Sequence, residues 1–184
     1  MSSGDPSLWH REGERLIAST RVLDLFSVRF VNPTLKKDRE FVVANAPDWV
    51  NVVARTTSGE LVLVRQFRFG SNAFSLEVPG GVMEAGEDPL VAGLRELSEE
   101  TGFAGGVAKI IGCVNPNPAI MNNRCHFVFV DGVVHTRPVH WDPDEEIQVS
   151  TAPAVQVLEW ARSGRITHSL TVAALLFYEG IARV

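Results

Sequence analysis

The sequence predicts an α/β protein, and three patterns lead to that class. Short runs rich in Val, Phe and Leu recur along the chain between turn residues, as is typical of β-strands. A helical stretch near the middle carries a capping signal at each end. A strongly apolar helical stretch (LTVAALLFYEG) lies near the C-terminus and is expected to pack on the sheet. With 184 residues, the chain can form one domain with a sizeable core.

The N-terminal part, residues 1–46, is expected to contribute two strands of its own. A polar lead-in that contains Trp9 comes first, and a lone aromatic residue near a terminus is usually a packing anchor. Strands are then expected at residues 21–31 and 40–45, with a turn that begins at Asn32-Pro33. This part precedes the segment that carries the metal-binding motif described below.

The remainder, residues 47–184, is expected to form the main domain. Residues 49–57 and 61–69 are separated by a short turn at Gly59 and predict a β-hairpin. Two prolines and four asparagines in residues 115–123 predict a loop. Further strands are expected at residues 74–78, 107–114, 124–133 and 147–150. Two helices complete the chain, one near residues 153–162 with Thr151 as its cap and one at residues 169–181.

The central helix carries three glutamates on one side. Asp88 suits the N-cap and Gly102 the position after the C-terminus. Glu96, Glu99 and Glu100 lie at i, i+3 and i+4, so their side chains are neighbours and repel one another. A divalent cation such as Mg²⁺ would remove the conflict, because it takes oxygen ligands. The alternative is a solvated acidic helix face, but the glycine-rich stretch that precedes the helix favours a ligand site.

These residues resemble the Nudix box. Gly81, Glu87 and the run from Arg95 to Phe103 fill every fixed position of the pattern GX5EX7REUXEEXGU, in which U is a bulky apolar residue. The resemblance implies a Nudix fold over residues 47–184: a mixed β-sheet sandwiched between helices, with the box at residues 81–103 and an N-terminal antiparallel extension. It also implies Mg²⁺, or Mn²⁺, as the cofactor and an ion pair between Glu87 and Arg95. The implied metal ligands are the Gly80 carbonyl and the side chains of Glu96, Glu99 and Glu100.

Other features resemble the branch of the family that cleaves ADP-ribose. They are the run LVLVRQFR, the early β extension and Pro118, fifteen residues beyond Phe103. In that branch the extension serves dimerisation, so a homodimer is expected. The resemblance implies substrate contacts, with diphosphate binding first by Arg68 and then by Arg65. The candidate substrate-binding residues are Arg68, Arg65, Glu77, Trp49, Trp9 and Pro118. For the two arginines a solvent-facing position, and for Glu77 a structural role, remain alternatives.

The acidic stretch HWDPDEEI, residues 140–147, is a candidate source of the general base. Hydrolysis needs a group that deprotonates water, and a carboxylate near a metal can do so. The related enzymes carry their base in a loop at this place, which implies Glu145 first and Glu146 second. We count Glu99 with the catalytic residues as well. A solvated acidic loop is the alternative.

Composition narrows the class of partner. A formal net charge of −5 argues against non-specific nucleic-acid binding. The chain contains no apolar run long enough to cross a membrane and no signal peptide, so a cytoplasmic location is expected. Cys113 and Cys125 form neither a disulfide framework nor a zinc motif, and both are expected in the core.

The predicted function is Mg²⁺-dependent hydrolysis of the pyrophosphate bond of a nucleoside diphosphate sugar, ADP-ribose first. One alternative keeps the chemistry and changes the substrate to a dinucleoside polyphosphate, capped RNA or NADH. The other is a module that senses ADP-ribose without cleaving it. An intact box favours catalysis over sensing.

Overall fold

The structure is a computed structural model that describes residues 5–136, 138–139 and 146–182. It confirms the expected fold class: a mixed α/β protein with a three-stranded antiparallel sheet at the N-terminus. The chain forms two compact units. The first unit runs to Pro47 and includes Asn115–Asn123, and the second comprises Asp48–Val114 and the chain from Arg124 onward.

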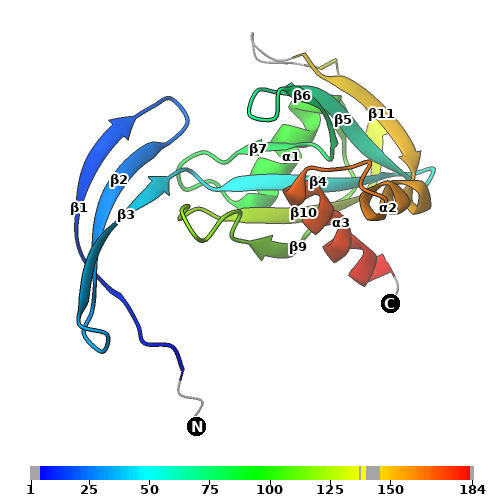
Figure 1. Cartoon of the computed structure of the whole chain (residues 1–184). Coiled ribbons are helices and arrows are strands. Elements are labelled where there is room, and N and C mark those ends of the chain that lie inside the picture. The colour runs from blue at the N-terminus through cyan, green and yellow to red at the C-terminus, as the bar shows by residue number, and fades with distance from the viewer. Residues whose placement is uncertain (1–4, 137, 140–145, 183–184) are drawn as a thin grey trace. The chain divides into compact units, whose positions relative to one another are not determined.

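The first unit is built on three strands in the order β1-β2-β3 (Figure 1). They are β1 (His10–Ser19), β2 (Asp24–Asn32) and β3 (Lys37–Asn45), and each neighbouring pair is antiparallel. The loop Asn115–Asn123 is hydrogen-bonded to β3, because the Ala44 N–H donates to the Ile120 carbonyl at 2.7 Å. The proline-rich loop is therefore part of the same unit as the early strands.

The second unit is built on an eight-stranded mixed sheet. Its main path is β11-β5-β4-β10-β8, with β6 beside β5, β7 beside β4 and β9 beside β10. The pair β4–β10 is parallel and the others are antiparallel. The strands are β4 (Trp49–Thr56), β5 (Glu60–Arg68), β6 (Ala73–Glu77), β7 (Gly80–Val82), β8 (Phe103–Ala104), β9 (Val107–Val114), β10 (Cys125–His135) and β11 (Gln148–Pro153).

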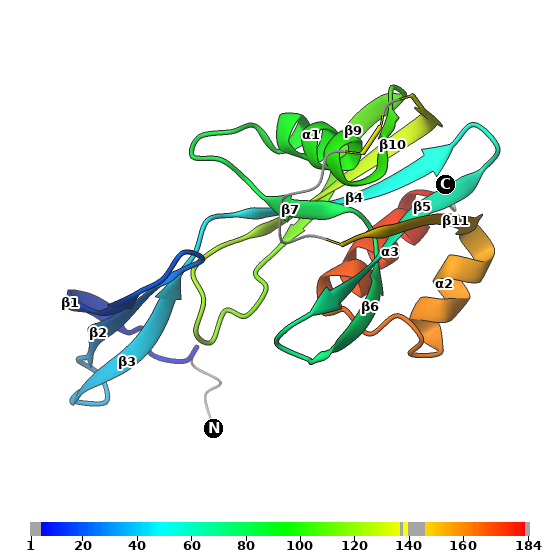
Figure 2. The ribbon, with the colours of Figure 1, turned by 90° about the horizontal axis from the view of Figure 1, so that it is seen from above.

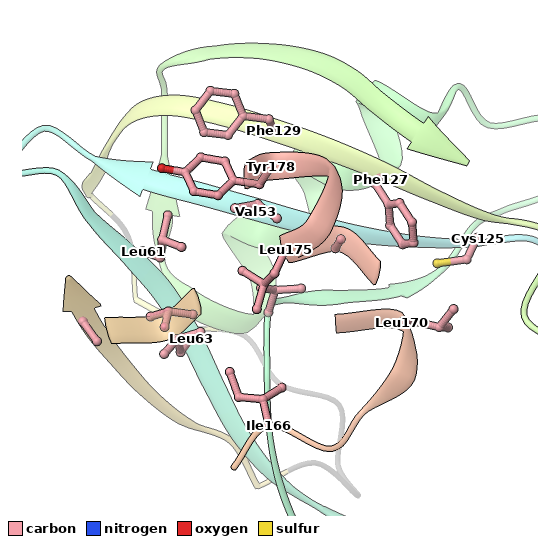
Figure 3. Packing of buried hydrophobic residues seen from close by; sticks show 14 residues of the cluster. Val53, Leu61, Leu63, Cys125, Phe127, Phe129, Ile166, Leu170, Leu175 and Tyr178 are labelled. Atoms are coloured by element: carbon pink, nitrogen blue, oxygen red, sulfur yellow. The ribbon is translucent and has the colours of Figure 1, made fainter. Parts of the chain in front are cut away.

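Helices cover both faces of this sheet (Figure 2). One face packs against α1 (Pro89–Thr101), with Leu97 buried against alternate residues of β4 and β10 such as Val52. The other face packs against α2 (Ala154–Arg162) and α3 (Ser169–Ala182). Leu175 of α3 and Phe127 of β10 lie in this second core (Figure 3). The strands are apolar on both sides because both sides are covered.

Several local expectations were wrong. Strands β1, β7 and β8 were not expected from the sequence. Thr151 does not cap α2: it lies in β11, its hydroxyl donates to Glu60 at 3.0 Å, and α2 has Pro153 at the N-cap without a side-chain bond. Cys125 is buried as expected, but Cys113 is exposed.

Among the described residues, no helix is long and apolar enough to cross a membrane.

Candidate active site

The site is built around the two glycines of β7, which lie against β4 and α1. A Cβ at Gly80 would lie 2.2 Å from the Val50 carbonyl oxygen, so only glycine allows β7 to approach β4 this closely. A Cβ at Gly81 would lie 2.6 Å from the carboxylate of Glu96. The absence of side chains on this strand therefore lets a glutamate of α1 pack directly on its backbone.

Helix α1 holds its glutamates at fixed positions because both ends are capped as predicted. The Leu90 N–H donates to the Asp88 carboxylate at 2.8 Å, and Gly102 is left-handed with φ 71°. Glu100 is 5% exposed, and its Oε2 accepts a 2.9 Å hydrogen bond from the Gly80 N–H. Glu100 and the Glu96 carboxylate beside Gly81 therefore both lie against β7.

Arg95 connects the remaining acidic groups. Its Nε and Nη2 donate to the two oxygens of Glu87, each at 3.0 Å, which confirms the expected ion pair. Its Nη1 donates to Glu96 at 2.8 Å and to Glu99 at 3.2 Å, and its Nη2 also reaches the Val82 carbonyl. The hydrogen bonds of Arg95 hold the pKa of Glu87 below its ordinary value, and those of Glu87 raise the pKa of Arg95. One guanidinium thus bridges three carboxylates and offsets part of their negative charge.

The oxygen atoms at the site between α1 and β7 are of the kind that a hard divalent cation binds. Glu96, Glu99 and Glu100 carry carboxylate oxygens, and the neighbouring strand β7 carries backbone carbonyl oxygens. The described residues contain no group of three or more His, Cys, Asp or Glu side chains gathered closely enough to hold an ion. Glu96 and Glu99 both turn to Arg95 instead, so metal binding would require their contacts with Arg95 to be exchanged for metal bonds.

A second charged group surrounds Glu77 at the end of β6. Glu77 is 1% exposed and accepts two hydrogen bonds from Arg68, at 2.9 and 2.7 Å. Burial raises the pKa of Glu77, but the hydrogen bonds and charge of Arg68, with a smaller effect of His168, lower it by more, so that it lies below its ordinary value. Arg68 is therefore held in a fixed position by a forked, two-bond contact with the buried carboxylate.

His168 completes this group, and sequence reasoning missed it. Its Nδ1 accepts a 3.3 Å hydrogen bond from the Thr171 N–H, so the proton of the neutral ring lies on Nε2, 3.9 Å from a Glu77 oxygen. Burial lowers the pKa of His168, the charge of Glu77 opposes the change and that of Arg68 adds to it. The only sequence signal was its position immediately before a predicted helix.

The two candidate phosphate-binding arginines lie on opposite faces of β5. Successive side chains of a strand alternate, and residues 65 and 68 differ by an odd number. Arg65 pairs in register with Leu76 and stacks on the Phe74 ring at 4.1 Å, whereas Arg68 binds Glu77. The structure therefore separates Arg65 from Arg68.

The remaining candidate site residues from the sequence lie in different parts of the two units. Trp49 begins β4 and packs, half-buried, at the edge of the α2–α3 core. Glu146 is exposed shortly before β11, and Glu145 lies outside the described residues. In the first unit, Trp9 and Pro118 line one pocket of about 350 Å³. Phe41, which was not among the candidates, meets Trp9 edge to face at 5.7 Å in the same pocket.

Comparison with known proteins gives the family. A family model described as NUDIX domain matches residues 46–170. The chain is 32% identical over 184 residues to a Mus musculus protein named ADP-sugar pyrophosphatase, covering 92% of this chain and 84% of the relative. The chain therefore belongs to the NUDIX family, and the expected enzyme class, a Nudix pyrophosphohydrolase, is confirmed.

Two further proteins are similar over most of their length. The Bacillus subtilis protein named ADP-ribose pyrophosphatase is 27% identical over 164 residues, which is 89% of this chain and 88% of the relative. A crystal structure described as an ADP compounds hydrolase superposes with a TM-score of 0.85 at 18% identity, covering 98% of this chain and 97% of that one. The structural likeness shows that the fold is shared.

Proposed function

We propose that this chain hydrolyses the pyrophosphate bond of a nucleoside diphosphate sugar, with ADP-ribose as the first candidate, to a nucleoside monophosphate and a sugar phosphate. The observation that carries the proposal is the arrangement of Glu96 and Glu100 of α1 against the bare backbone of Gly80 and Gly81. Relatives named for ADP-sugar and ADP-ribose pyrophosphatase activity support the choice of substrate.

Mg²⁺ is the proposed cofactor, and Mn²⁺ could replace it. The residues that would hold it are Glu96, Glu99, Glu100 and the Gly80 carbonyl, whose oxygens suit a hard cation. When bound, such an ion supplies positive charge beside the phosphates and lowers the pKa of a bound water. Arg95 stays close to Glu87 and keeps the loop before α1 in place.

Arg68 is the proposed group that orients the diphosphate. Glu77 fixes its guanidinium through Nε and one terminal nitrogen, and this fixed position supports the proposal that Arg68 contacts the diphosphate. Because Glu77 is buried and ionised, Arg68 keeps its position before substrate arrives, which lowers the ordering cost of binding.

The proton of the attacking water is proposed to pass to a carboxylate just before β11. Glu145 is the first candidate and Glu146 the second. Glu146 is exposed and can accept a proton without breaking a structural contact among the described residues.

The pocket of the first unit is the proposed place for the nucleobase. It is lined by Trp9, Phe30, Phe41 and Pro118, and its volume of about 350 Å³ suits a small planar ligand. Trp9 and Phe30 both meet Phe41 edge to face, at 5.7 and 5.9 Å. Stacking on an aromatic side chain favours a base over an aliphatic group.

A second copy of this chain is the proposed partner of the first unit. Every residue of β1 is exposed, and β1 is an edge strand that can pair with another strand. Apolar side chains there are also exposed, by 52% at Leu16 and 47% at Ile17, which is typical of an interaction surface. A sedimentation experiment that finds only monomer at all concentrations would refute the dimer.

The proposed activity is tested by product analysis. The protein is incubated with ADP-ribose, GDP-mannose, UDP-glucose, a diadenosine polyphosphate and NADH, each with and without Mg²⁺. We expect Mg²⁺-dependent release of a nucleoside monophosphate from the sugar nucleotides. Preferred cleavage of the other compounds would replace the substrate class, and binding without turnover would refute catalysis.

A further inference from the structure

Besides the aromatic pocket of the first unit, a pocket with a polar lining lies in the second unit, on the face of the sheet opposite α1. It has a volume of about 360 Å³ and is formed by β5, β6, β11 and the end of α2. The face is fixed by register: Arg65 lies on the same side of β5 as Leu63, which belongs to the α2–α3 core. The polar and aromatic residues of its lining are Arg65, Phe74, Gln148, Ser150, Trp160 and Arg165.

Two guanidinium groups are held in this pocket by stacking. The Arg65 group lies 4.1 Å from the centre of the Phe74 ring, and the Arg165 group lies 4.2 Å from that of Trp160. Stacking uses the flat face of a guanidinium and leaves the N–H groups at its edge available for hydrogen bonds. Because the rings restrict both side chains, little conformational freedom remains to be lost when a ligand binds.

Within the described part of the chain, neither of these guanidinium groups forms an ion pair. Of the described residues, none that lines the pocket is acidic, and no Asp or Glu lies within salt-bridge distance of Arg65 or Arg165. Its other polar groups, Gln148 and Ser150, are uncharged donors or acceptors. In a chain with a net charge of −5, the described lining of this pocket is a local concentration of positive charge.

We propose that this pocket binds a phosphate monoester, at a site separate from the glutamates of α1. A phosphate monoester carries about −1.5 to −2 charges at pH 7 and three acceptor oxygens. Two forked guanidinium edges, with Ser150 and Gln148 beside them, match that charge and number of acceptors better than a single carboxylate would. The volume leaves room for a small sugar or glycerol carrying the phosphate.

The test is calorimetric titration of the full chain in EDTA, which removes divalent metal and stops turnover. The probes are inorganic phosphate, ribose 5-phosphate and glycerol 3-phosphate, with ribose as the uncharged control. We expect saturable binding of all three phosphates, weakened at least tenfold in Arg165→Gln. Arg21→Gln changes the net charge equally at an exposed position outside the pocket, and Glu99→Gln alters α1; both should bind as the unchanged protein does.

A second readout keeps the test independent of the variant's stability. The indole N–H signal of Trp160, assigned with Trp160→Phe, should shift as phosphate is added to the unchanged protein. Tighter binding of ribose 5-phosphate than of glycerol 3-phosphate would point to a sugar phosphate as the ligand, and the reverse to another phosphorylated metabolite. Equal phosphate binding by Arg165→Gln and the unchanged protein, or no saturable binding at millimolar phosphate, would overturn the proposal whether or not the chain hydrolyses ADP-ribose.

Discussion

At the scale of single residues, the site depends on two glycines without side chains and on one arginine that bonds several carboxylates. Gly80 and Gly81 are adjacent, but their surroundings differ: one faces backbone of β4 and the other the end of a flexible glutamate. Arg95 offers five donors, and they serve Glu87, Glu96, Glu99 and a carbonyl. Lysine, a compact point charge, could not make this set of bonds.

The two glycines should therefore respond differently to alanine. Gly80→Ala places a Cβ 2.2 Å from the Val50 carbonyl oxygen, so β7 must move and stability should fall by about 1–3 kcal/mol. For Gly81→Ala the three atoms nearest the added carbon all belong to the Glu96 carboxylate, the end of a side chain that can move, so stability should be nearly unchanged while turnover falls. Urea unfolding and a rate assay on both variants measure this. Gly13→Ala, with open space around the added carbon, is the control. Equal stability loss in the two β7 variants would contradict the account.

His168 should make the stability depend on pH. Burial lowers its pKa in the folded chain, so the unfolded chain binds more protons as the pH falls below about 6.5. This contribution is fully present above pH 6.5 and is lost as the pH falls toward the lower, folded pKa. The free energy of unfolding should rise from pH 5 to 7.5, by no more than about 1.4 kcal/mol per pH unit for one proton. His168→Gln should flatten the slope, and His10→Gln, at an exposed position of β1, should not. Equal slopes in both variants would refute the assignment.

At the scale of elements, the sequence predicted best where local signals and tertiary packing agree. Helix α1 has its N-cap at Asp88 and its left-handed Gly102 as expected. Strand β1 was missed because its sequence, HREGERLIAS, is mostly polar and, in the part of the chain that the structure describes, β2 is its one paired strand. Strand β7 is three residues long and contains two glycines, which disfavour strands on propensity alone. Its formation depends on β4, which is distant in the sequence.

The cap of α1 should contribute measurably to stability. Asp88→Ala removes the acceptor of the Leu90 N–H, at a cost of about 1 kcal/mol. Asp88→Asn keeps an acceptor oxygen at the same place and should remain close to the unchanged protein. Chemical unfolding of the two variants measures the difference. If both lose the same stability, the carboxylate has a role other than capping.

At the scale of the whole molecule, the sheet of the second unit separates two sets of charged groups. The glutamates of the box are on α1, whereas Arg65 and Arg165 lie on the face covered by α2 and α3. The box motif predicted the first set from the sequence, because its spacing is local. Alternation along the predicted strand at residues 61–69 already implies that Arg65 and Arg68 diverge, but the partner of Arg68, Glu77, could not be predicted from the sequence. His168 was missed for the same reason: its partner lies 91 positions away in the sequence.

The central claim is that the glutamates of α1 support metal-dependent hydrolysis. The most direct measurement is the rate of nucleoside monophosphate release from ADP-ribose as Mg²⁺ is removed with EDTA and restored, in the unchanged protein and in Glu99→Gln. Glu99 has a side chain 48% exposed, so this change should leave the fold intact. We expect turnover to vanish without Mg²⁺, to return with it, and to fall by orders of magnitude in the variant while the unfolding midpoint stays the same. Near-normal turnover in Glu99→Gln, or hydrolysis that EDTA does not affect, would contradict the claim.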